Sequence, residues 1–234
     1  MKVLALETSA KSVSAAVLDG DTVRASCFSC TGLTHSRTLM PMVESMLKNA
    51  GLTLEEMDAV AVAAGPGSFT GLRIGVSAAK GLAWAADKPC VGVSTLEAMA
   101  QNLAHMDALL ICAMDARRNQ VYNALFEAKD GTLTRLTDDR AIAVSELADE
   151  LAGQKRRMLV LGDGAVLCRD GLAAAGIVCE LAPEALRWQN AVGVGLAAQH
   201  GECVSAQQLV PAYLRLSQAE RERAARLEKE ESSK

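Results

Sequence analysis

AAGPGSFTGLRIG, residues 63–75, joins a predicted buried strand to a predicted helix of small residues. Its glycines allow two interpretations. They let a backbone approach an anion closely at the N-terminus of a helix, and they also let a chain turn sharply between a strand and a helix. The stretch lacks the lysine and the final spacing of G-x-x-x-x-G-K-[ST], so it is not a P-loop. The sequence leaves open whether it holds a phosphate or shapes a surface.

The residues around this stretch alternate between strands and helices. The first 30 or so residues predict an antiparallel meander of three strands, with a hairpin turn at Gly20–Asp21. A helix is expected from about His35 to Ala50, because its apolar residues fall on one stripe and Gly51 follows. The apolar run at 59–64 predicts a strand buried on both faces. After the glycines, a helix is expected from about Thr70 to Ala86.

A strand at 90–94 and a helix opened by the capping box STLE, residues 94–97, complete the first half of the chain. The second half repeats the order of the first. There, strands are predicted at 108–115, 120–128, 132–139, 157–161 and 176–181, and helices at 144–153 and 188–201. Each half is a meander of strands, a helix, and then alternating strands and helices. The sequence therefore predicts an α/β protein with a duplicated topology, although no strong sequence repeat accompanies it.

Composition narrows the class of function. The chain has 234 residues, half of them hydrophobic, and a formal charge of −4. Binding nucleic acid unaided requires clustered lysine and arginine, and no such cluster dominates this chain. The start, MKVLALETSAK, does not have the pattern of a signal peptide, because Glu7 and Lys11 interrupt its apolar run. No stretch is long and apolar enough for a membrane span. We therefore expect a cytoplasmic protein without membrane contact.

Cysteine and histidine patterns favour no metal site. The seven cysteines are scattered in mostly apolar surroundings, as reduced core thiols are. Cys27 and Cys30 form a C-x-x-C pair, but a zinc site would need a second pair of ligands. A redox pair would open a helix, whereas this one lies in strand-like sequence, so ordinary strand cysteines are favoured. The three histidines have no partner at i+4, and no catalytic triad can be assigned.

Glu7, Thr8 and Ser9 form the candidate cofactor site. A carboxylate at the end of the first strand, followed by hydroxyls and a turn, could bind a metal–phosphate. Sugar kinases and actin-like ATPases usually have Asp and then Gly in this turn, whereas this chain has Glu7 and Ser9. A Cβ atom at Ser9 restricts the approach of the backbone to phosphate. The three residues therefore read as a degenerate phosphate loop, and a surface acid is the simpler alternative for Glu7.

Three further stretches contain weaker signals. Arg73 lies near the start of a helix, where a cation opposes the dipole, so it suggests a salt bridge, a partner carboxylate or a plain surface arginine. In MDARRNQVY, residues 114–122, an internal ion pair of Asp115 with one of the turn arginines, Arg117 or Arg118, is favoured over a small anion site. LGDGA, residues 161–165, lies where a second phosphate loop would be in a duplicated actin-like fold, but a lone G-x-G is a weak signal.

Taken together, the motifs resemble one family. LALETSAKSVSAAVLDG, HSRTLMPMVESML, DAVAVAAGPGSFTGLRIGVSAAKGLAW, VGVSTLEAMA, DARRNQVY and PAYLR are similar to the bacterial TsaB (YeaZ) proteins, over Met1 to about Leu216. The resemblance implies a two-lobed actin-like (ASKHA) fold of duplicated βββαβα units, with mixed sheets flanked by helices. It implies a first lobe at 1–103 with the partner interface and a smaller second lobe at 104–216, whose C-terminal helix packs back on the first. A charged tail follows at 217–234.

The same resemblance implies a function in tRNA modification. It implies a non-catalytic subunit required for threonylcarbamoyladenosine (t6A) at adenosine 37 of tRNAs that read codons starting with A. The catalytic subunit of that family is the paralogue TsaD, which holds a metal with paired histidines in an H-x-x-x-H arrangement. The corresponding stretch here, TLEAMAQNLAH, has only His105. The implied partners are TsaD, the ATPase TsaE in a ternary complex, and tRNA only through that complex.

The resemblance also implies a contact surface on the first-lobe helices, used with TsaD or in a homodimer when the chain is alone. Small residues in the helix after the glycines would allow close helix approach, and methionines suit an adaptable contact. The implied interface residues are His35, Leu39, Met40, Val43, Met46, Thr70, Arg73, Val76, Ala79 and Lys80. The simpler alternative is that both helices only cover the sheet.

Two rival functions stay open. An actin-like fold could bind ATP between its lobes as a stand-alone nucleotide-dependent hydrolase or kinase, which agrees with older glycoprotease-type descriptions of the family. A direct tRNA-binding module is the other rival, and the acidic balance argues against it. If the chain is a non-catalytic subunit, it requires no cofactor of its own. ATP or ADP is then expected, if anywhere, at the interface of the complex.

Overall fold

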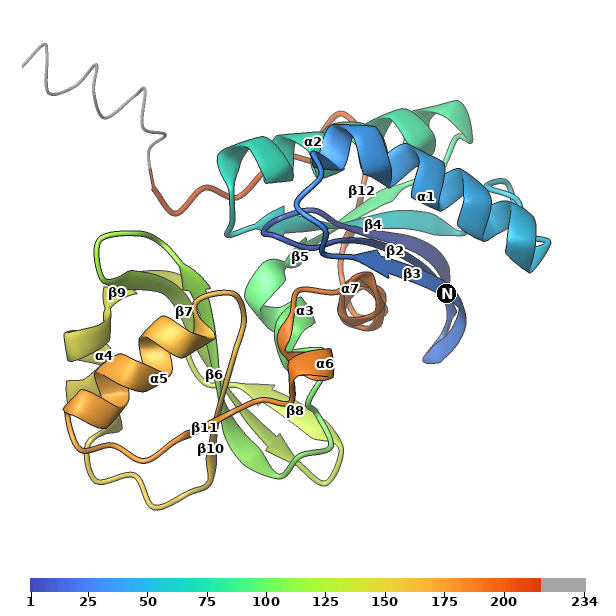
Figure 1. Cartoon of the computed structure of the whole chain (residues 1–234). Helices are drawn as coiled ribbons and strands as arrows, with labels where there is room; N and C mark the ends of the chain where they lie inside the picture. The colour runs from blue at the N-terminus through green and yellow to red at the C-terminus, as the bar shows by residue number, and fades with distance from the viewer. Residues whose placement is uncertain (216–234) are drawn as a thin grey trace, which may run out of the picture.

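The computed structural model describes residues 1–215, so the expected charged tail at 217–234 lies outside the described residues. Two six-stranded sheets form the framework (Figure 1). The first has the order β12-β5-β4-β1-β2-β3, and the second has the order β11-β10-β6-β7-β8, with β9 also paired to β7. The strands of the first sheet are β1 (Lys2–Glu7), β2 (Val13–Asp19), β3 (Thr22–Ser29), β4 (Ala59–Gly65), β5 (Cys90–Ser94) and β12 (Cys203–Val204).

The second sheet repeats the pairing of the first. Its strands are β6 (Ala108–Asp115), β7 (Gln120–Lys129), β8 (Thr132–Arg135), β9 (Arg140–Ala143), β10 (Met158–Leu161) and β11 (Glu180–Leu181). In both sheets the first strand pairs antiparallel with the second and parallel with the strand that follows the first helix. The predicted α/β class and duplicated topology are confirmed.

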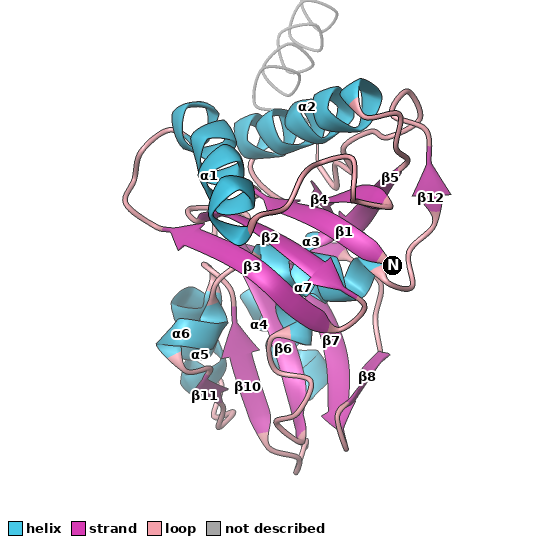
Figure 2. Cartoon of the chain, turned by 90° about the vertical axis from the view of Figure 1, so that its right-hand side faces the viewer, coloured by secondary structure: helices cyan, strands magenta, loops and turns pink. Residues whose placement is uncertain are grey.

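Helices cover both faces of the first sheet (Figure 2). α1 (His35–Ala50) and α2 (Phe69–Ala85) lie on one face, over a core that contains Leu4, Leu6 and Val62. On the opposite face α7 (Ala191–Ala198) packs against a second cluster of small and branched residues. Alanine and valine dominate these layers, as expected for strands buried on both faces.

The second sheet is covered in the same way by helices from both halves of the chain. α4 (Val144–Leu151) and α5 (Ala165–Ala174) pack on its outer face. α3 (Thr95–Gln101), which follows the first sheet in sequence, packs on its inner face. The short α6 (Glu184–Arg187) precedes α7. Each lobe therefore supplies a helix to the core of the other.

α3 and α7 meet between the two sheets at a position that requires glycine. A Cβ atom added to Gly193 in α7 would lie 2.0 Å from the carbonyl oxygen of Ala98 in α3. Glycine lets the two helices approach at backbone distance. α7 and β12 fall within the range 104–216 expected for the second lobe, and both lie on the first sheet. The expectation included such a helix packing back on the first lobe but no such strand; the lobe boundaries themselves stay a prediction.

Several elements differ from the expected ones. α2 begins at Phe69 rather than about Thr70, because the Ser68 side chain accepts from the backbone N–H of Gly71 and caps the helix. α7 begins at Ala191, where Asn190 provides the cap, and not at 188. The third strand of the second meander, expected at 132–139, ends at Arg135 as β8, and a separate strand, β9, follows.

α5 and β12 carry little sequence signal. In α5, Gly171 interrupts the apolar pattern, and a Cβ atom there would lie 2.4 Å from Val144 Cγ1, so α4 and α5 need glycine to pack together. β12 is two residues long. None of the helices in residues 1–215 is both long and apolar enough to cross a membrane.

Candidate functional site

The glycines of residues 63–75 pack against the turn that follows β1. A Cβ atom added to Gly67 would lie 2.6 Å from the carbonyl oxygen of Ser9, and one added to Gly71 would lie 2.1 Å from that of Thr8. At Gly75 it would lie 2.3 Å from Thr8 Oγ1. Real Cβ atoms do not come so close, so these glycines are required by contacts within the chain. The stretch shapes the junction of β4, α2 and the β1–β2 turn.

The three residues of the predicted phosphate loop are engaged in the same junction. Thr8 Oγ1 donates to the carbonyl of Gly71 at 2.7 Å, and the backbone N–H of Ser9 donates to Glu7 Oε1 at 2.5 Å. The carbonyl of Ser9 accepts from the N–H of Ser68 at 2.7 Å. Ser9 Oγ is buried and has no hydrogen-bond partner among the described residues. Only this hydroxyl could serve a phosphate, so the residues fit a nucleotide poorly.

Burial also changes the chemistry of Glu7. Its side chain is fully buried at the end of β1, and this burial raises the pKa of Glu7 to about 7. The hydrogen bond from the backbone N–H of Ser9 opposes the rise, and the nearby carboxylate of Asp163 adds to it. The carboxyl of Glu7 therefore keeps its proton to a much higher pH than an exposed glutamate does. Glu7 Oε2 has no partner among residues 1–215.

A cavity of about 570 Å³ opens above this turn, between the two lobes. An Asp–Arg ion pair lies on its second-lobe side as predicted, and of the two turn arginines it is Arg117 that takes part, with Nη1 3.5 Å from Asp115 Oδ2, although Arg117 is mostly exposed. Asp163 accepts from Gln189 Nε2 at 2.9 Å, and burial raises the pKa of Asp163. The charged residues that line the cavity are Lys11, Asp115, Arg117, Asp163 and Arg215.

The second glycine turn, residues 161–165, is a packing feature as well. A Cβ atom at Gly162 would lie 2.2 Å from the carbonyl oxygen of Ala113, and one at Gly164 would lie 2.7 Å from the N atom of Asp115. Gly162 also has φ +106°, which favours glycine. Both glycine turns therefore hold the end of a central strand, β1 in one lobe and β6 in the other.

A shallow apolar groove of about 560 Å³ lies between α1 and α2. Met40 is 42% exposed, and Thr70 and Arg73 are exposed beside it. The residues that line the groove are Ser36, Leu39, Met40, Thr70, Arg73, Ile74, Ser77 and Ala78. Thr70 lines this groove and also the cavity between the lobes, so the two features adjoin.

Known proteins match this chain over nearly its whole length. The family model described as "TsaD: tRNA N6-adenosine threonylcarbamoyltransferase" matches residues 30–222. The "tRNA threonylcarbamoyladenosine biosynthesis protein TsaB" of Bacillus subtilis (strain 168) is 36% identical over 224 residues, covering 94% of this chain and 96% of that protein. The chain belongs to the TsaB family. "YeaZ from Pseudomonas aeruginosa" is similar in structure, with TM-score 0.75 and 29% identity, covering 91% of this chain and 99% of that one.

A more distant structure supports the fold of this TsaB-family chain. The (R)-2-hydroxyglutaryl-CoA dehydratase component A of Acidaminococcus fermentans has TM-score 0.50 and 12% identity, covering 85% of this chain and 97% of that one. At that identity the likeness concerns the fold alone. With the duplicated sheets, it identifies the expected two-lobed actin-like (ASKHA) fold.

Half of the interface residues implied by the TsaB resemblance are core residues. Their side chains are at most 6% exposed and pack between the helices and the first sheet, so they are unavailable to a partner in this conformation. These buried residues are Leu39, Val43, Met46, Val76 and Ala79. They belong to the apolar stripe of each amphipathic helix, and that stripe is the face that packs on the core.

The other five implied residues lie at or near the surface. Met40, Thr70 and Arg73 line the α1–α2 groove. His35 and Lys80 are partly exposed but bonded internally: His35 Nε2 lies 2.7 Å from the carbonyl oxygen of Ala10, and Lys80 Nζ donates to the carbonyl of Leu209 at 3.1 Å. Sequence reasoning missed two lining residues, Ser36 and Ile74, and counted Ser77 and Ala78 only among the small residues of the helix. The spacing 70, 73, 74, 77 along α2 could have identified this face.

Cysteines and acids form no metal centre in the part of the chain that the structure describes. No group of three or more His, Cys, Asp or Glu side chains could hold an ion there. All seven cysteines are free, and Cys27 lies in β3 as expected for a strand cysteine. Cys30 follows the strand and is exposed.

Residues 205–215 form a strap that joins the TsaB-family motifs to one another. The N–H of Ala212 donates to the carbonyl of Ala64 at 2.7 Å, and the Tyr213 ring stacks on Phe69 with centroids 4.4 Å apart. Arg73 Nε donates to Tyr213 Oη at 2.9 Å, and Arg215 Nη1 donates to the carbonyl of Ala116 at 2.7 Å. The strap therefore ties the glycine stretch of the first lobe to the second lobe.

Removing the Tyr213 ring should loosen this strap. We expect Tyr213→Ala to lower the free energy of unfolding by about 2 kcal/mol, because it removes both the stack on Phe69 and the bond from Arg73. Tyr213→Phe keeps the stack and should lose only about 1 kcal/mol. Urea unfolding followed by circular dichroism measures both. Equal losses in the two variants would show that the stack contributes nothing.

Proposed function

We propose that this chain acts in the synthesis of threonylcarbamoyladenosine at adenosine 37 of tRNA, as a non-catalytic subunit that binds and supports TsaD, with TsaE joining the complex. The observation that carries the proposal is the whole-length similarity to a TsaB protein, whose printed name places it in that biosynthesis. The engaged state of Glu7, Thr8 and Ser9 supports a role without its own nucleotide site. The stretch that corresponds to the metal ligands of TsaD has one histidine, His105.

The α1–α2 groove is the surface that we assign to the partner. It is apolar, it is open, and its rim has Met40 on one helix and Ile74 on the other. Flexible methionine side chains suit a surface that must adapt to TsaD or, when the chain is alone, to a second copy. Buried residues such as Leu39 hold the helices in place and do not touch the partner in this proposal.

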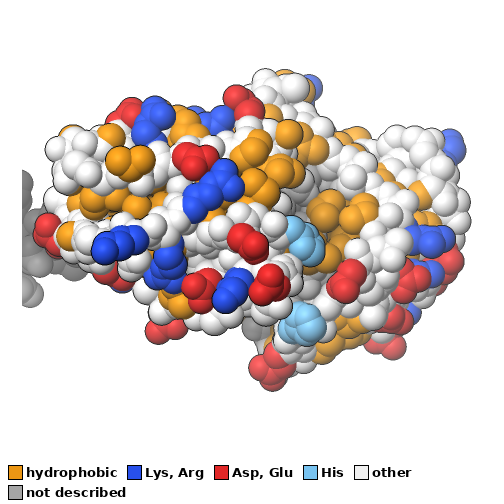
Figure 3. All heavy atoms as spheres, turned by 90° about the horizontal axis from the view of Figure 1, so that it is seen from below, with side chains coloured by type: hydrophobic (Ala, Val, Ile, Leu, Met, Phe, Trp, Pro, Cys, Tyr) orange, Lys and Arg blue, Asp and Glu red, His pale blue; other side chains and the backbone are white. Residues whose placement is uncertain are grey.

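tRNA would be bound through the complex, in the cytoplasm. The described residues on the face shown in Figure 3 alternate between positive and negative side chains, without a continuous basic patch. Phosphate contacts need such a patch, which the partner would supply. No cofactor is required by this chain in the proposal. ATP or ADP, where it takes part, would lie at the interface of the complex, since Thr70 borders both the cavity and the groove.

Met40→Glu and Ser77→Arg should each weaken the complex with TsaD. Both positions line the α1–α2 groove, and a charge placed in an apolar contact is costly, so we expect affinity to fall at least about tenfold. Gel filtration with light scattering measures the complex of this chain with the TsaD and TsaE of the same organism. tRNA threonylcarbamoylation in the same fractions measures activity.

Ser145→Arg is the matched control, because Ser145 is an exposed serine of α4 outside this groove. Unchanged assembly in Met40→Glu and Ser77→Arg would overturn the assigned face. Activity of this chain without TsaD would overturn the whole proposal. It would also restore the alternative of a stand-alone nucleotide-dependent hydrolase or kinase, for which ATP turnover with Glu7→Ala as control is the direct assay.

A further inference from the structure

β3 is an unusually long open edge for this molecule. It ends the first sheet and has eight residues, whereas the strands at the other sheet margins have two (β11, β12) or four (β8, β9). Short edge strands are one way in which proteins avoid pairing with other chains. A strand of eight residues spans about 26 Å, which is enough to pair with an extended segment.

The usual protections are present at only one end of this edge. A β-bulge falls where the register shifts between Val17 and Leu18, opposite Arg24, and Arg24 provides a charge there. The remainder, residues 25–29, has neither charge nor proline. Phe28, on the strand, is 47% exposed. The edge is therefore open to strand addition over its second half.

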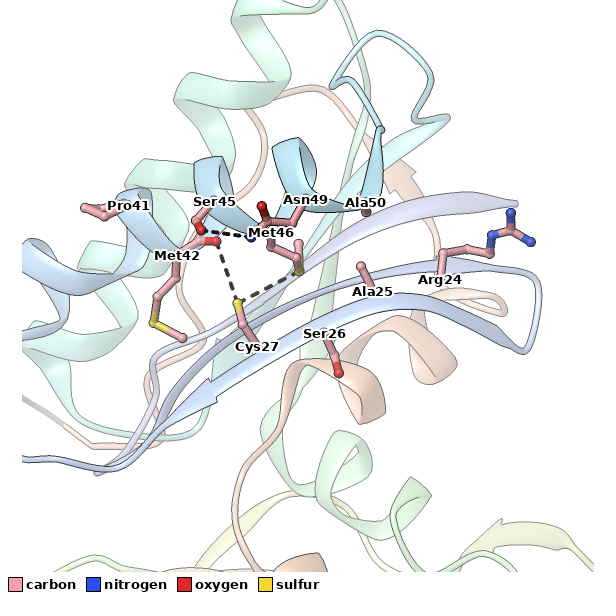
Figure 4. A pocket seen from close by; sticks show the side chains of 10 residues that line it. All are labelled: Arg24, Ala25, Ser26, Cys27, Pro41, Met42, Ser45, Met46, Asn49 and Ala50. Atoms are coloured by element: carbon pink, nitrogen blue, oxygen red, sulfur yellow. Dashed lines mark hydrogen bonds between the residues drawn. The ribbon is translucent and has the colours of Figure 1, made fainter.

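A groove of about 580 Å³ runs beside this edge, between β3 and α1 (Figure 4). Cys27, Met42 and Met46 line its floor with sulfur atoms, and Cys27 Sγ lies 3.9 Å from Met46 Sδ. Such side chains are polarisable and adapt to varied apolar groups. Ser45 and Asn49 are exposed along the helix side.

The positive charge at one end of the groove favours an occupant with an acidic side chain. Arg24 is the single charged residue of its lining, and it extends from one end of β3 (Figure 4). Among the described residues its guanidinium has no hydrogen bond and no ion pair. A carboxylate on the incoming chain would complement it. The β3 strand of a second copy of this chain would instead bring another Arg24, and its residues 22–29 include no acidic side chain.

We propose that β3 and the β3–α1 groove bind an extended segment of a partner protein by strand addition. The segment adds a strand outside β3, so that its backbone pairs with residues 25–29. Alternate side chains of the segment are apolar and enter the groove over Met42 and Met46. An acidic side chain lies beside Arg24. This surface is on the other side of α1 from the groove assigned to TsaD, and the inference does not depend on that assignment.

Selection of short random peptides displayed on phage against the full chain tests the proposal. The enriched peptides should alternate apolar residues and contain Asp or Glu near one end. Ser45→Arg places a long charged side chain in the groove and should weaken the selected peptide at least about tenfold in fluorescence anisotropy. Ser145→Arg, at an exposed serine of α4 that lines neither groove, is the matched control and should leave the affinity unchanged. Circular dichroism checks that both variants are folded.

Charge reversal and hydrogen exchange complete the test. Arg24→Glu should weaken the same peptide about tenfold, and a lysine in place of its acid should restore binding. The bound peptide should slow exchange of the amides of residues 25–29. Failure to enrich any peptide, or binding that Ser45→Arg does not affect, would overturn the proposal. Protection of these amides that increases with protein concentration in the absence of peptide would show that the edge pairs with a second copy of the chain. That result would overturn the proposal as well.

Discussion

Gly71→Ala should lower the free energy of unfolding by about 3 kcal/mol or more, the upper range for overpacking a well-packed site. The added methyl would lie 2.1 Å from the carbonyl oxygen of Thr8, which is backbone and cannot rotate away. Thr8 is itself fully buried and bonded to Gly71, so neither side can move alone. Urea unfolding monitored by circular dichroism measures the loss.

Gly81→Ala is the matched control in the same helix. A Cβ atom at Gly81 meets nothing within 4 Å, so alanine there should gain about 1 kcal/mol through helix propensity. The two substitutions are chemically identical and opposite in expected sign. A neutral Gly71→Ala would mean that the β1–β2 turn moves freely, and the stretch at 63–75 could then open toward a phosphate after all.

Glu7→Gln should make the protein more stable at pH 8 and leave it nearly unchanged at pH 4.5. The folded-state pKa of Glu7, about 7, is above the ordinary value of 4.5. The folded protein therefore binds a proton that the unfolded chain has released, and this stabilisation is lost as pH rises from 4.5 to 7. Over 2.5 units at 1.36 kcal/mol each, the loss is about 3 kcal/mol. Glutamine never ionises and keeps an oxygen for the Ser9 N–H, so it avoids the loss.

Unfolding curves of Glu7→Gln and the natural chain, taken across pH 4.5–8, measure this difference directly. Glu180→Gln is the control of opposite sign, because Arg157 lowers the pKa of Glu180 and its stabilisation is lost as pH falls. Parallel curves for Glu7→Gln and the natural chain would show that Glu7 is equally ionised in the folded and unfolded states.

Local pattern was sufficient for the architecture. Alternation, apolar runs and cap residues predicted nearly all strands and helices of the two sheets, because each signal lies within a single element. β9, β12, α5 and the four-residue α6 were missed. The two strands are only four and two residues long, and α5 has a glycine whose reason, contact with Val144, lies in another helix.

The site depended on contacts between distant residues. Whether 63–75 holds a phosphate is decided by Thr8 and Ser9, which are some 60 residues away. The strap showed in the sequence only as the motif PAYLR, and its stack of Tyr213 on Phe69 brings together residues that are far apart in the sequence. For the contact face, the family resemblance pointed to α1 and α2, and half of the residues named there lie on the buried stripe of these helices.

The exchange of helices between the lobes has a consequence for synthesis. A nascent chain leaves the ribosome N-terminus first, and domains generally fold in that order. Here β1, β2 and β4 emerge long before α7, residues 191–198, which covers their second face. The first lobe therefore waits, with one apolar face uncovered, until almost the whole protein has been translated. A premature stop after the first lobe would release a truncated product whose apolar sheet face stays exposed. Such a product would be a substrate for chaperones and proteases and would not function as an independent lobe.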